Sequence, residues 1–277
     1  MYVIRPFDPW KSRLCTCPPK YSFNPYTGCS HDCLYCYSTY IPNFRKLRTK
    51  KNLFKMVLRD LDKLPKGTLI SMSNSSDPYP PEETRFRVTQ RCLEIFKNFD
   101  IKLLVTTKGD TVRRDVKLLS ELNAAVSITI TCDSKIARIL EPKAPTTESR
   151  IDTIKALKDS GIPTILRFDP IIPYINENDL WLIEKCEPEH VVSSTLKLRW
   201  DAFKRLISAF PSLKNKYKEL YIEKGNKIQG YLYLSEKYRL SLLSKVKEKC
   251  EELGISYAFC REGIEFKAKS CDGSHLI

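Results

Sequence analysis

Short apolar runs alternate with amphipathic stretches from about residue 67 onward, and this alternation predicts strands separated by helices. The apolar runs predict strands at residues 68–73, 101–106, 125–130 and 163–168, and a weaker one at 189–192. The amphipathic stretches predict helices at about 82–98, from 110 or 111 onward, at about 147–160 and at about 178–186. This order indicates right-handed βαβ units around a parallel sheet. An open six-stranded barrel and a doubly wound sheet both fit, and both place the chemistry at the carboxyl ends of the strands.

The alternation stops after about residue 193. Beyond that point the pattern predicts two basic helices, at about 201–210 and 236–252. We therefore interpret residues 1–192 as one domain with an N-terminal arm, and residues 193–277 as a basic C-terminal extension packed on it.

Composition narrows the compartment and the partners. The 277 residues show no signal peptide and no stretch of roughly 20 apolar residues, so we expect a cytoplasmic protein without a membrane partner. In that compartment, eleven cysteines indicate metal binding or buried thiols rather than disulfides. The formal net charge of +14 favours a nucleic acid as partner. A thermophile-like surface rich in Lys and Glu is the alternative.

Three cysteines lie close together in one segment: Cys29, Cys33 and Cys36. A structural zinc site takes four protein ligands, whereas a 4Fe–4S cluster held by three thiolates keeps one iron open for a small molecule. Zinc would need His31 as its fourth ligand, and the loop would be strained because His31 stands between two of the cysteines. A disulfide with a spare thiol is the other alternative. The three thiols favour the open cluster.

The C-x3-C-x2-C spacing, with Tyr35 before the last cysteine, resembles the signature of the radical S-adenosylmethionine (SAM) enzymes. The resemblance implies an α/β fold, a partial (β/α)6 TIM barrel of parallel strands. It implies that Cys29, Cys33 and Cys36 hold a 4Fe–4S cluster whose open iron binds SAM. It also implies that an external electron donor drives the cleavage of SAM to a 5′-deoxyadenosyl radical.

Polar residues follow the predicted strands, where such a barrel would bind SAM. We expect Ser76 and Asp77 to meet the ammonium group of SAM, and Lys108 to meet its carboxylate. The other candidates are Ser127 and Thr129 for the ribose, Ile171 and Ile172 beside Pro170 for the adenine, and Tyr35 and Arg167. Each residue taken alone is also an ordinary loop or capping residue.

Further segments together resemble the spore photoproduct lyase-related proteins, also labelled DNA repair photolyase-like. They are residues 24–29, 76–79, 84–87, 104–108, 113–115, 140–145 and 170–176. The lyase uses a cysteine near the end of the strand that here continues into residues 73–77, where this chain has none. Cys132, at the end of another predicted strand, is the candidate catalytic replacement, and a buried core thiol is the alternative.

Four more cysteines lie in irregular segments marked by Gly or Pro: Cys15, Cys17, Cys260 and Cys271. Loop cysteines suit metal binding better than core packing. They predict a second site, an iron–sulfur cluster or zinc, that joins the N-terminal arm to the tail. Unconnected free thiols are the alternative.

Basic residues cluster at positions 45–51, and in the tail they are interleaved with aromatic ones, Trp200, Phe203 and Tyr217. This pattern suits RNA or unpaired DNA, and a solvated surface is the alternative. Three hypotheses follow. The first is a radical SAM enzyme, DNA repair-like or tRNA-modifying, that acts on a nucleic acid; the second is one that acts on a peptide or small metabolite. The third is a metal-stapled nucleic-acid-binding protein without enzyme activity.

Overall fold

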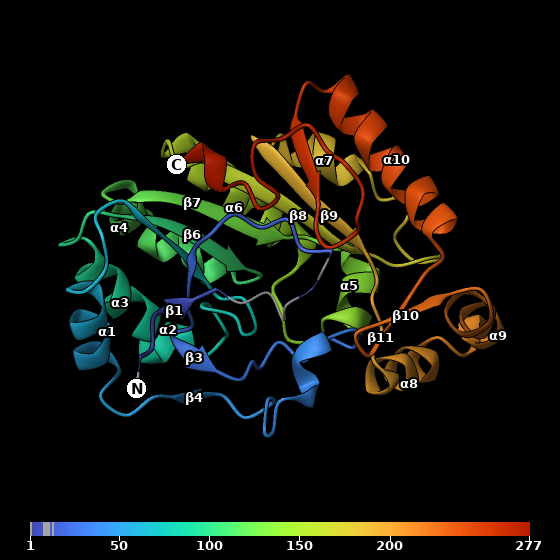
Figure 1. The fold of residues 1–277 in the computed structure, drawn as a ribbon, viewed down its shortest axis with the longest axis horizontal. Coiled ribbons are helices and arrows are strands. Elements are labelled where there is room, and N and C mark those ends of the chain that lie inside the picture. The colour runs from blue at the N-terminus through green and yellow to red at the C-terminus, as the bar shows by residue number, and fades with distance from the viewer. Residues whose placement is uncertain (1, 8–11, 13) are drawn as a thin grey trace.

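A curved, mostly parallel sheet forms the centre of the molecule (Figure 1). The computed structural model describes residues 2–7, 12 and 14–277. Within them, the sheet has the order β1-β2-β5-β6-β7-β8-β9-β12. Its strands are β1 (Arg5–Pro6), β2 (Tyr21–Phe23), β5 (Thr68–Met72), β6 (Ile101–Thr107), β7 (Asn123–Thr129), β8 (Thr164–Ile171), β9 (His190–Thr195) and β12 (Ser256–Phe259). Neighbours from β2 to β12 are parallel, and β1 is antiparallel to β2.

Helices connect the parallel strands and cover the outer face of the sheet (Figure 1). They are α1 (Leu53–Leu61), α2 (Glu83–Phe86), α3 (Val88–Phe96), α4 (Val116–Ser120), α5 (Ser134–Leu140), α6 (Thr147–Asp159), α7 (Trp181–Cys186) and α10 (Glu236–Glu252). In the described part of the chain, no helix is both long and apolar enough to cross a bilayer.

Smaller elements surround this core. Two further two-stranded antiparallel sheets pair β3 (Tyr26–Thr27) with β4 (Arg48–Thr49), and β10 (Asn226–Ile228) with β11 (Tyr231–Tyr233). The tail adds α8 (Trp200–Ala209), α9 (Lys214–Lys218) and the π-helical turn η4 (Glu219–Glu223). The 3₁₀ turns are η1 (Tyr37–Tyr40), η2 (Asp110–Asp115), η3 (Pro211–Leu213) and η5 (Ser274–Leu276).

The inner face of the sheet changes from apolar to polar along the strands. Leu104, Ala125, Ile165 and Val192 form a separate apolar cluster, against which the chain end packs with Leu276 and Ile277. Two residues further along each strand, the same face carries polar side chains such as Thr106 and Arg167. The chain end therefore closes one end of the barrel, and the carboxyl ends of the strands stay polar.

The predicted partial barrel of parallel strands is confirmed, with local differences. The helix predicted at about 82–98 is two helices, because Arg87 adopts a left-handed conformation with φ +49° between them. The last strand, β12, comes from the tail, where sequence analysis found no strand; it pairs with β9. The predicted boundary between residues 192 and 193 falls within β9. The tail thus contributes to the sheet itself, and the division into two domains stays a prediction.

Candidate functional site

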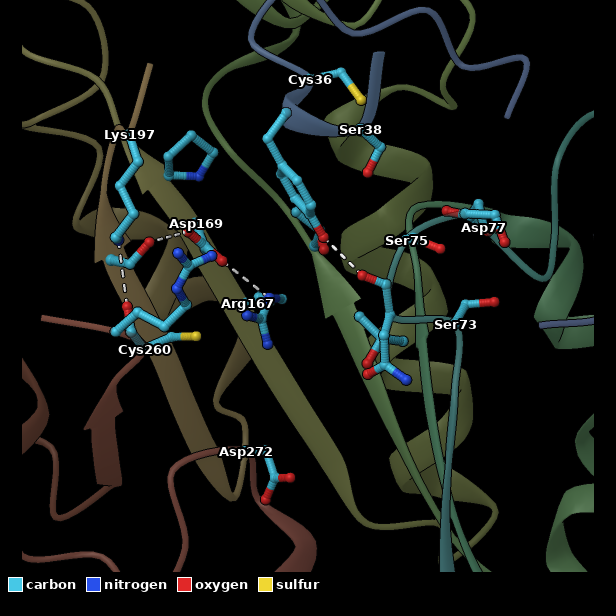
Figure 2. Close-up of a pocket in the computed structure, with 18 of the residues that line it drawn as sticks. Cys36, Ser38, Ser73, Ser75, Asp77, Arg167, Asp169, Lys197, Cys260 and Asp272 are labelled. Atoms are coloured by element: carbon cyan, nitrogen blue, oxygen red, sulfur yellow. Dashed lines mark hydrogen bonds and ion pairs between the residues drawn. The ribbon is translucent and has the colours of Figure 1, made fainter. Parts of the chain in front are cut away.

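A cavity of about 290 Å³ opens at the carboxyl ends of the strands. This volume is close to the lower end of the range for small-molecule sites, ~300–1,000 Å³. The three triplet cysteines line it, and so do the four further cysteines at positions 15, 17, 260 and 271. Figure 2 shows Cys36 on the loop above the cavity, Ser73, Ser75 and Asp77 along one wall, and Asp169, Lys197 and Cys260 along the other. Two cysteine sets distant in sequence therefore share one cavity.

A buried ion pair anchors the triplet loop from below. Arg150 forms an ion pair with the Glu141 carboxylate at 2.6 Å, and both side chains are almost fully buried. The same carboxylate accepts hydrogen bonds from the Tyr35 hydroxyl and from Thr131 Oγ1. Burial would raise the pKa of Glu141, but Arg150, Lys108 and these hydrogen bonds lower it to about 2. A charged Glu141 thus fixes the residue immediately before Cys36.

The tail holds the same loop from the other side. Arg205 in α8 donates to the Leu34 carbonyl at 2.8 Å and to the Cys36 carbonyl at 3.0 Å. Asp201, one helical turn earlier, pairs with Arg205 at 2.8 Å and accepts from the Thr39 hydroxyl. Sequence analysis grouped Arg205 with the basic residues for nucleic acid, but the structure assigns its guanidinium to the loop.

A close backbone approach shapes the entry to the triplet. Gly28 has φ +85°, and a Cβ there would lie 2.5 Å from the Phe44 carbonyl oxygen and 2.6 Å from that of Lys46. The Cys29 amide donates to the same Phe44 oxygen at 2.9 Å. Only glycine satisfies both the left-handed backbone and the space.

Asp77 lines the cavity, but its oxygens are engaged within the protein. Oδ1 accepts from the Thr107 hydroxyl at 2.5 Å and the Tyr79 amide at 2.8 Å, and Oδ2 accepts from the Lys108 amide at 2.8 Å. His31 Nε2 lies 3.2 Å from Oδ2. Burial would raise the pKa of Asp77, but His31 and these hydrogen bonds lower it to about 2. Asp77 thus ties the end of β5 to the end of β6.

The structure brings most of the candidate SAM-binding residues to the cavity. Those that line it are Tyr35, Ser76, Asp77, Lys108, Thr129 and Arg167. The Lys108 ammonium lies 3.9 Å from Glu141 Oε1 and 5.6 Å from the centre of the Tyr35 ring. Burial would lower the pKa of Lys108, but Glu141 raises it overall, so the side chain stays cationic.

Four candidates do not reach the cavity wall. Ile171 and Ile172 are buried in the core, where only the neighbouring Pro170 lines the cavity. Ser127 points to the same side as Thr129 but lies deeper; its hydroxyl has no hydrogen-bond partner among the described residues. Cys132 is fully buried in the hydrophobic core, the environment expected for the alternative, a core thiol; its catalytic role stays a prediction.

The donor set of the triplet fits an iron–sulfur cluster better than a single ion. All three thiols are free and face the cavity. Within residues 2–7, 12 and 14–277, no three His, Cys, Asp or Glu side chains converge tightly enough for one metal ion. His31 is engaged by Asp77 rather than by the cysteines. Thiolates around a multi-iron cluster lie farther apart than those around zinc, so this spacing argues against the zinc alternative.

Residues 23–185 match the family model of the Radical SAM superfamily. The chain belongs to the radical SAM superfamily. This is an enzyme family that uses a 4Fe–4S cluster and SAM. Family membership sets aside the hypothesis of a binding protein without enzyme activity.

The similar proteins match different shares of this chain and of their own length. An uncharacterized protein of Methanocaldococcus jannaschii is 35% identical over 56% of this chain and 61% of its own length. The radical SAM Nalpha-GlyT isomerase of Pseudomonas phage M6 is 24% identical over 86% of this chain and 53% of its own. The chain thus spans less than two thirds of either relative. A spore photoproduct lyase complexed with dinucleoside spore photoproduct superposes with a TM-score of 0.68 at 14% identity, over 86% of this chain and 75% of that one. This likeness concerns the fold.

Sequence reasoning missed the residues that hold the loop. Glu141 was part of a family-like segment, but Arg150 and Arg205 sit in helices whose local pattern gives no sign of a buried or loop-binding role. The one available signal was that Arg150 falls on the buried face of α6, which also carries the apolar residues Ile151 and Ile154.

Proposed function

We propose that this radical SAM enzyme acts on a nucleic acid, and that Cys29, Cys33 and Cys36 hold its 4Fe–4S cluster. When bound, the cluster and SAM supply a 5′-deoxyadenosyl radical. The residues of the chain bind, orient and enclose these groups. The three thiols bind iron, while Glu141 and Arg205 fix the backbone between them.

Lys108 and Thr129 are the best placed residues for SAM itself. Both line the cavity beside the triplet, and Lys108 carries an ammonium group suited to the SAM carboxylate. Asp77 acts by positioning, because its four interactions leave its carboxylate engaged. Arg167 and Asp169 pair at 3.0 Å at the centre of the cavity (Figure 2) and face the space left for substrate.

The observation that supports a nucleic acid is a stack of aromatic and guanidinium groups running into the cavity. The Arg199 guanidinium lies 4.4 Å from the Tyr40 ring centre and 5.2 Å from that of Tyr231. Arg261 lies 5.3 Å from the Tyr231 ring on the cavity side. Tyr40 is 38% exposed, and the neighbouring Trp200 is 51% exposed. The stack therefore leads from the surface to the cavity lining.

Bases stack on such surfaces, and phosphates are drawn to the same cations. Among the described residues, no carboxylate lies within ion-pair distance of Arg199 or Arg261. These two cations thus stay available for phosphates near the opening of the cavity, in a protein with net charge +14. Stacking contributes about 1–3 kcal/mol per base. A repair-type lyase step and an RNA modification both fit such a substrate.

The cluster assignment is tested by anaerobic reconstitution with iron and sulfide. The wild type is expected to release 5′-deoxyadenosine from SAM when a reductant is added, and Cys33→Ser to lose this release. Cys250→Ser is the matched control, because Cys250 is a buried thiol of α10. Equal release by wild type and Cys33→Ser would contradict the assignment.

The substrate class is tested by fluorescence anisotropy with single-stranded DNA, duplex DNA, RNA and peptides. Binding of a nucleic acid is expected, and it should weaken steeply as salt rises because counterions are released. Arg199→Ala is expected to weaken it about 5- to 100-fold, as loss of a stacking contact does. Arg91→Ala is the matched control: its guanidinium stacks on Phe54, 4.2 Å from the ring centre, away from the cavity. Release of 5′-deoxyadenosine stimulated by peptide and not by nucleic acid would support the second hypothesis instead.

A further inference from the structure

We propose that Cys15, Cys17, Cys260 and Cys271 form a second metal site in the wall of this cavity, taking a metal centre held by four thiolates, either an iron–sulfur cluster or zinc. The site joins the N-terminal arm to the tail. The inference does not depend on the substrate proposed above.

Two of these thiols already touch. Cys17 Sγ lies 3.3 Å from Cys271 Sγ, across 254 residues of sequence. Cys15 is two residues before Cys17 and lines the same cavity. No disulfide links them. Two segments at opposite ends of the chain thus meet through their sulfur atoms.

The fourth thiol faces the same space. Cys260 directly follows β12, and its amide donates to the Ser193 carbonyl at 2.8 Å, which continues the pairing with β9. Figure 2 shows its sulfur directed toward the inside of the cavity, close to Arg167. Cys260 lines the same cavity as Cys15, Cys17 and Cys271, so all four residues border one space.

Cys17 and Cys271 have polar surroundings, which core packing does not explain. Cys92, Cys186 and Cys250 are almost fully buried in the hydrophobic core, as structural thiols usually are. Cys17 and Cys271 instead lie beside the buried ion pair of Lys20 and Asp272. Cys260 packs against the apolar cluster that contains Leu104, and it also lies close to Arg167.

A divalent metal with four thiolates carries a net charge of about −2, and a buried charge of that size needs nearby cations. Lys20 and Arg167 are the cations beside these thiols, and each is also paired with a carboxylate, Lys20 with Asp272 and Arg167 with Asp169.

The contact between Cys17 and Cys271 is close to the spacing that two ligands of one zinc ion need. Sulfur atoms at 2.3 Å from a tetrahedral zinc lie about 3.8 Å from one another. The two sulfurs lie 3.3 Å apart, a difference of about half an ångström that side-chain rotation allows. No three such side chains among the described residues yet surround one ion, so metal binding would also require Cys15 and Cys260 to turn toward this pair.

The consequence is a fixed chain end. The residues after Cys271 lead to Leu276 and Ile277, which pack against the apolar cluster at one end of the barrel and are called the apolar plug below. The Lys102 ammonium donates to the Ile277 carbonyl at 3.0 Å. A metal at the four thiols would hold both the arm and this plug against the sheet, and would form part of the wall that faces the substrate.

The decisive experiment uses the full chain with the triplet removed. The variant Cys29→Ser/Cys33→Ser/Cys36→Ser is purified anaerobically, reconstituted with iron and sulfide, and analysed for iron, sulfide and zinc. We expect it to retain either about two to four irons with sulfide or about one zinc per chain. Iron–sulfur absorbance then distinguishes the two metals. A folded variant, by circular dichroism, that holds neither metal would overturn the proposal.

A second comparison assigns the metal to these residues. Adding Cys17→Ser/Cys271→Ser to the triplet variant is expected to remove the remaining metal. Adding Cys92→Ser/Cys250→Ser instead is the matched control and should leave the metal content unchanged, since both thiols are in the core. Metal that persists without Cys17 and Cys271 would also overturn the proposal. Failure of SAM cleavage, by contrast, would bear only on the triplet.

Discussion

The guanidinium of Arg205 donates a hydrogen bond to the carbonyl oxygen of Cys36 at 3.0 Å, across 169 residues of sequence. One residue belongs to a helix of the tail and the other to the loop that carries the triplet. The contact makes the tail part of the structure that supports the triplet loop, because it fixes the backbone to which a thiol is attached.

Arg205→Gln is expected to lower both iron retention and stability. The change removes hydrogen bonds from a charged donor to two loop carbonyls, each worth about 1.5–3 kcal/mol. The iron content after gel filtration measures iron retention, and urea unfolding measures stability. Lys204→Gln, the exposed neighbour, is the control and should resemble the wild type. Equal iron retention by both variants would show that the hydrogen bonds of Arg205 to the loop carbonyls are dispensable for iron binding.

Glu141→Gln is expected to destabilise the protein by about 3–5 kcal/mol, because it leaves the buried Arg150 charge without its carboxylate, with only the carbonyls of Pro145 and Thr129 as partners. Adding Arg150→Met should restore part of the loss, as seen by urea unfolding. Glu187→Gln removes an exposed carboxylate that pairs loosely with Lys158 at 3.9 Å, and should change stability by less than about 0.5 kcal/mol. A double variant no more stable than Glu141→Gln would speak against the buried pair as the cause.

Gly28→Ala is expected to displace the loop at Phe44 and Lys46 and to reduce bound iron. The new Cβ would lie within 2.6 Å of two carbonyl oxygens, and the left-handed backbone adds about 1–2 kcal/mol of strain. Gly67→Ala is a matched control, because Gly67 has φ +69° but open space around its Cβ position. Gly67→Ala should lower the stability through the same backbone strain but leave the iron content unchanged. Similar iron loss in both would remove the steric explanation.

Stability is expected to fall as the pH drops from about 6.5 to about 4. Burial, with the neighbouring His275, lowers the pKa of His190 to about 4, whereas the unfolded chain titrates near 6.5. The unfolded state therefore binds more protons in this window, and stability decreases by about 1.4 kcal/mol per pH unit for the group. Urea unfolding at several pH values measures the slope, which should be shallower in His190→Phe. Parallel curves for the two proteins would refute the assignment.

The alternation of apolar and polar segments was sufficient to predict five parallel strands and the barrel class, because burial on both faces leaves a local signature in each strand. It missed β12, a strand of four residues that follows a long excursion through the tail. The pattern also placed Ile171 and Ile172 at a ligand, where the fold buries them in the core.

The sequence by itself determined the triplet and the family, and it predicts an open cluster at the triplet, since these depend on residue types at short spacings. Only the tertiary structure decided what surrounds the triplet. Arg205, the pair of Glu141 and Arg150, and the meeting of Cys17 with Cys271 all join segments far apart in the chain. Such contacts depend on how the curved sheet closes and where the tail returns to it, and local periodicity carries no information about either.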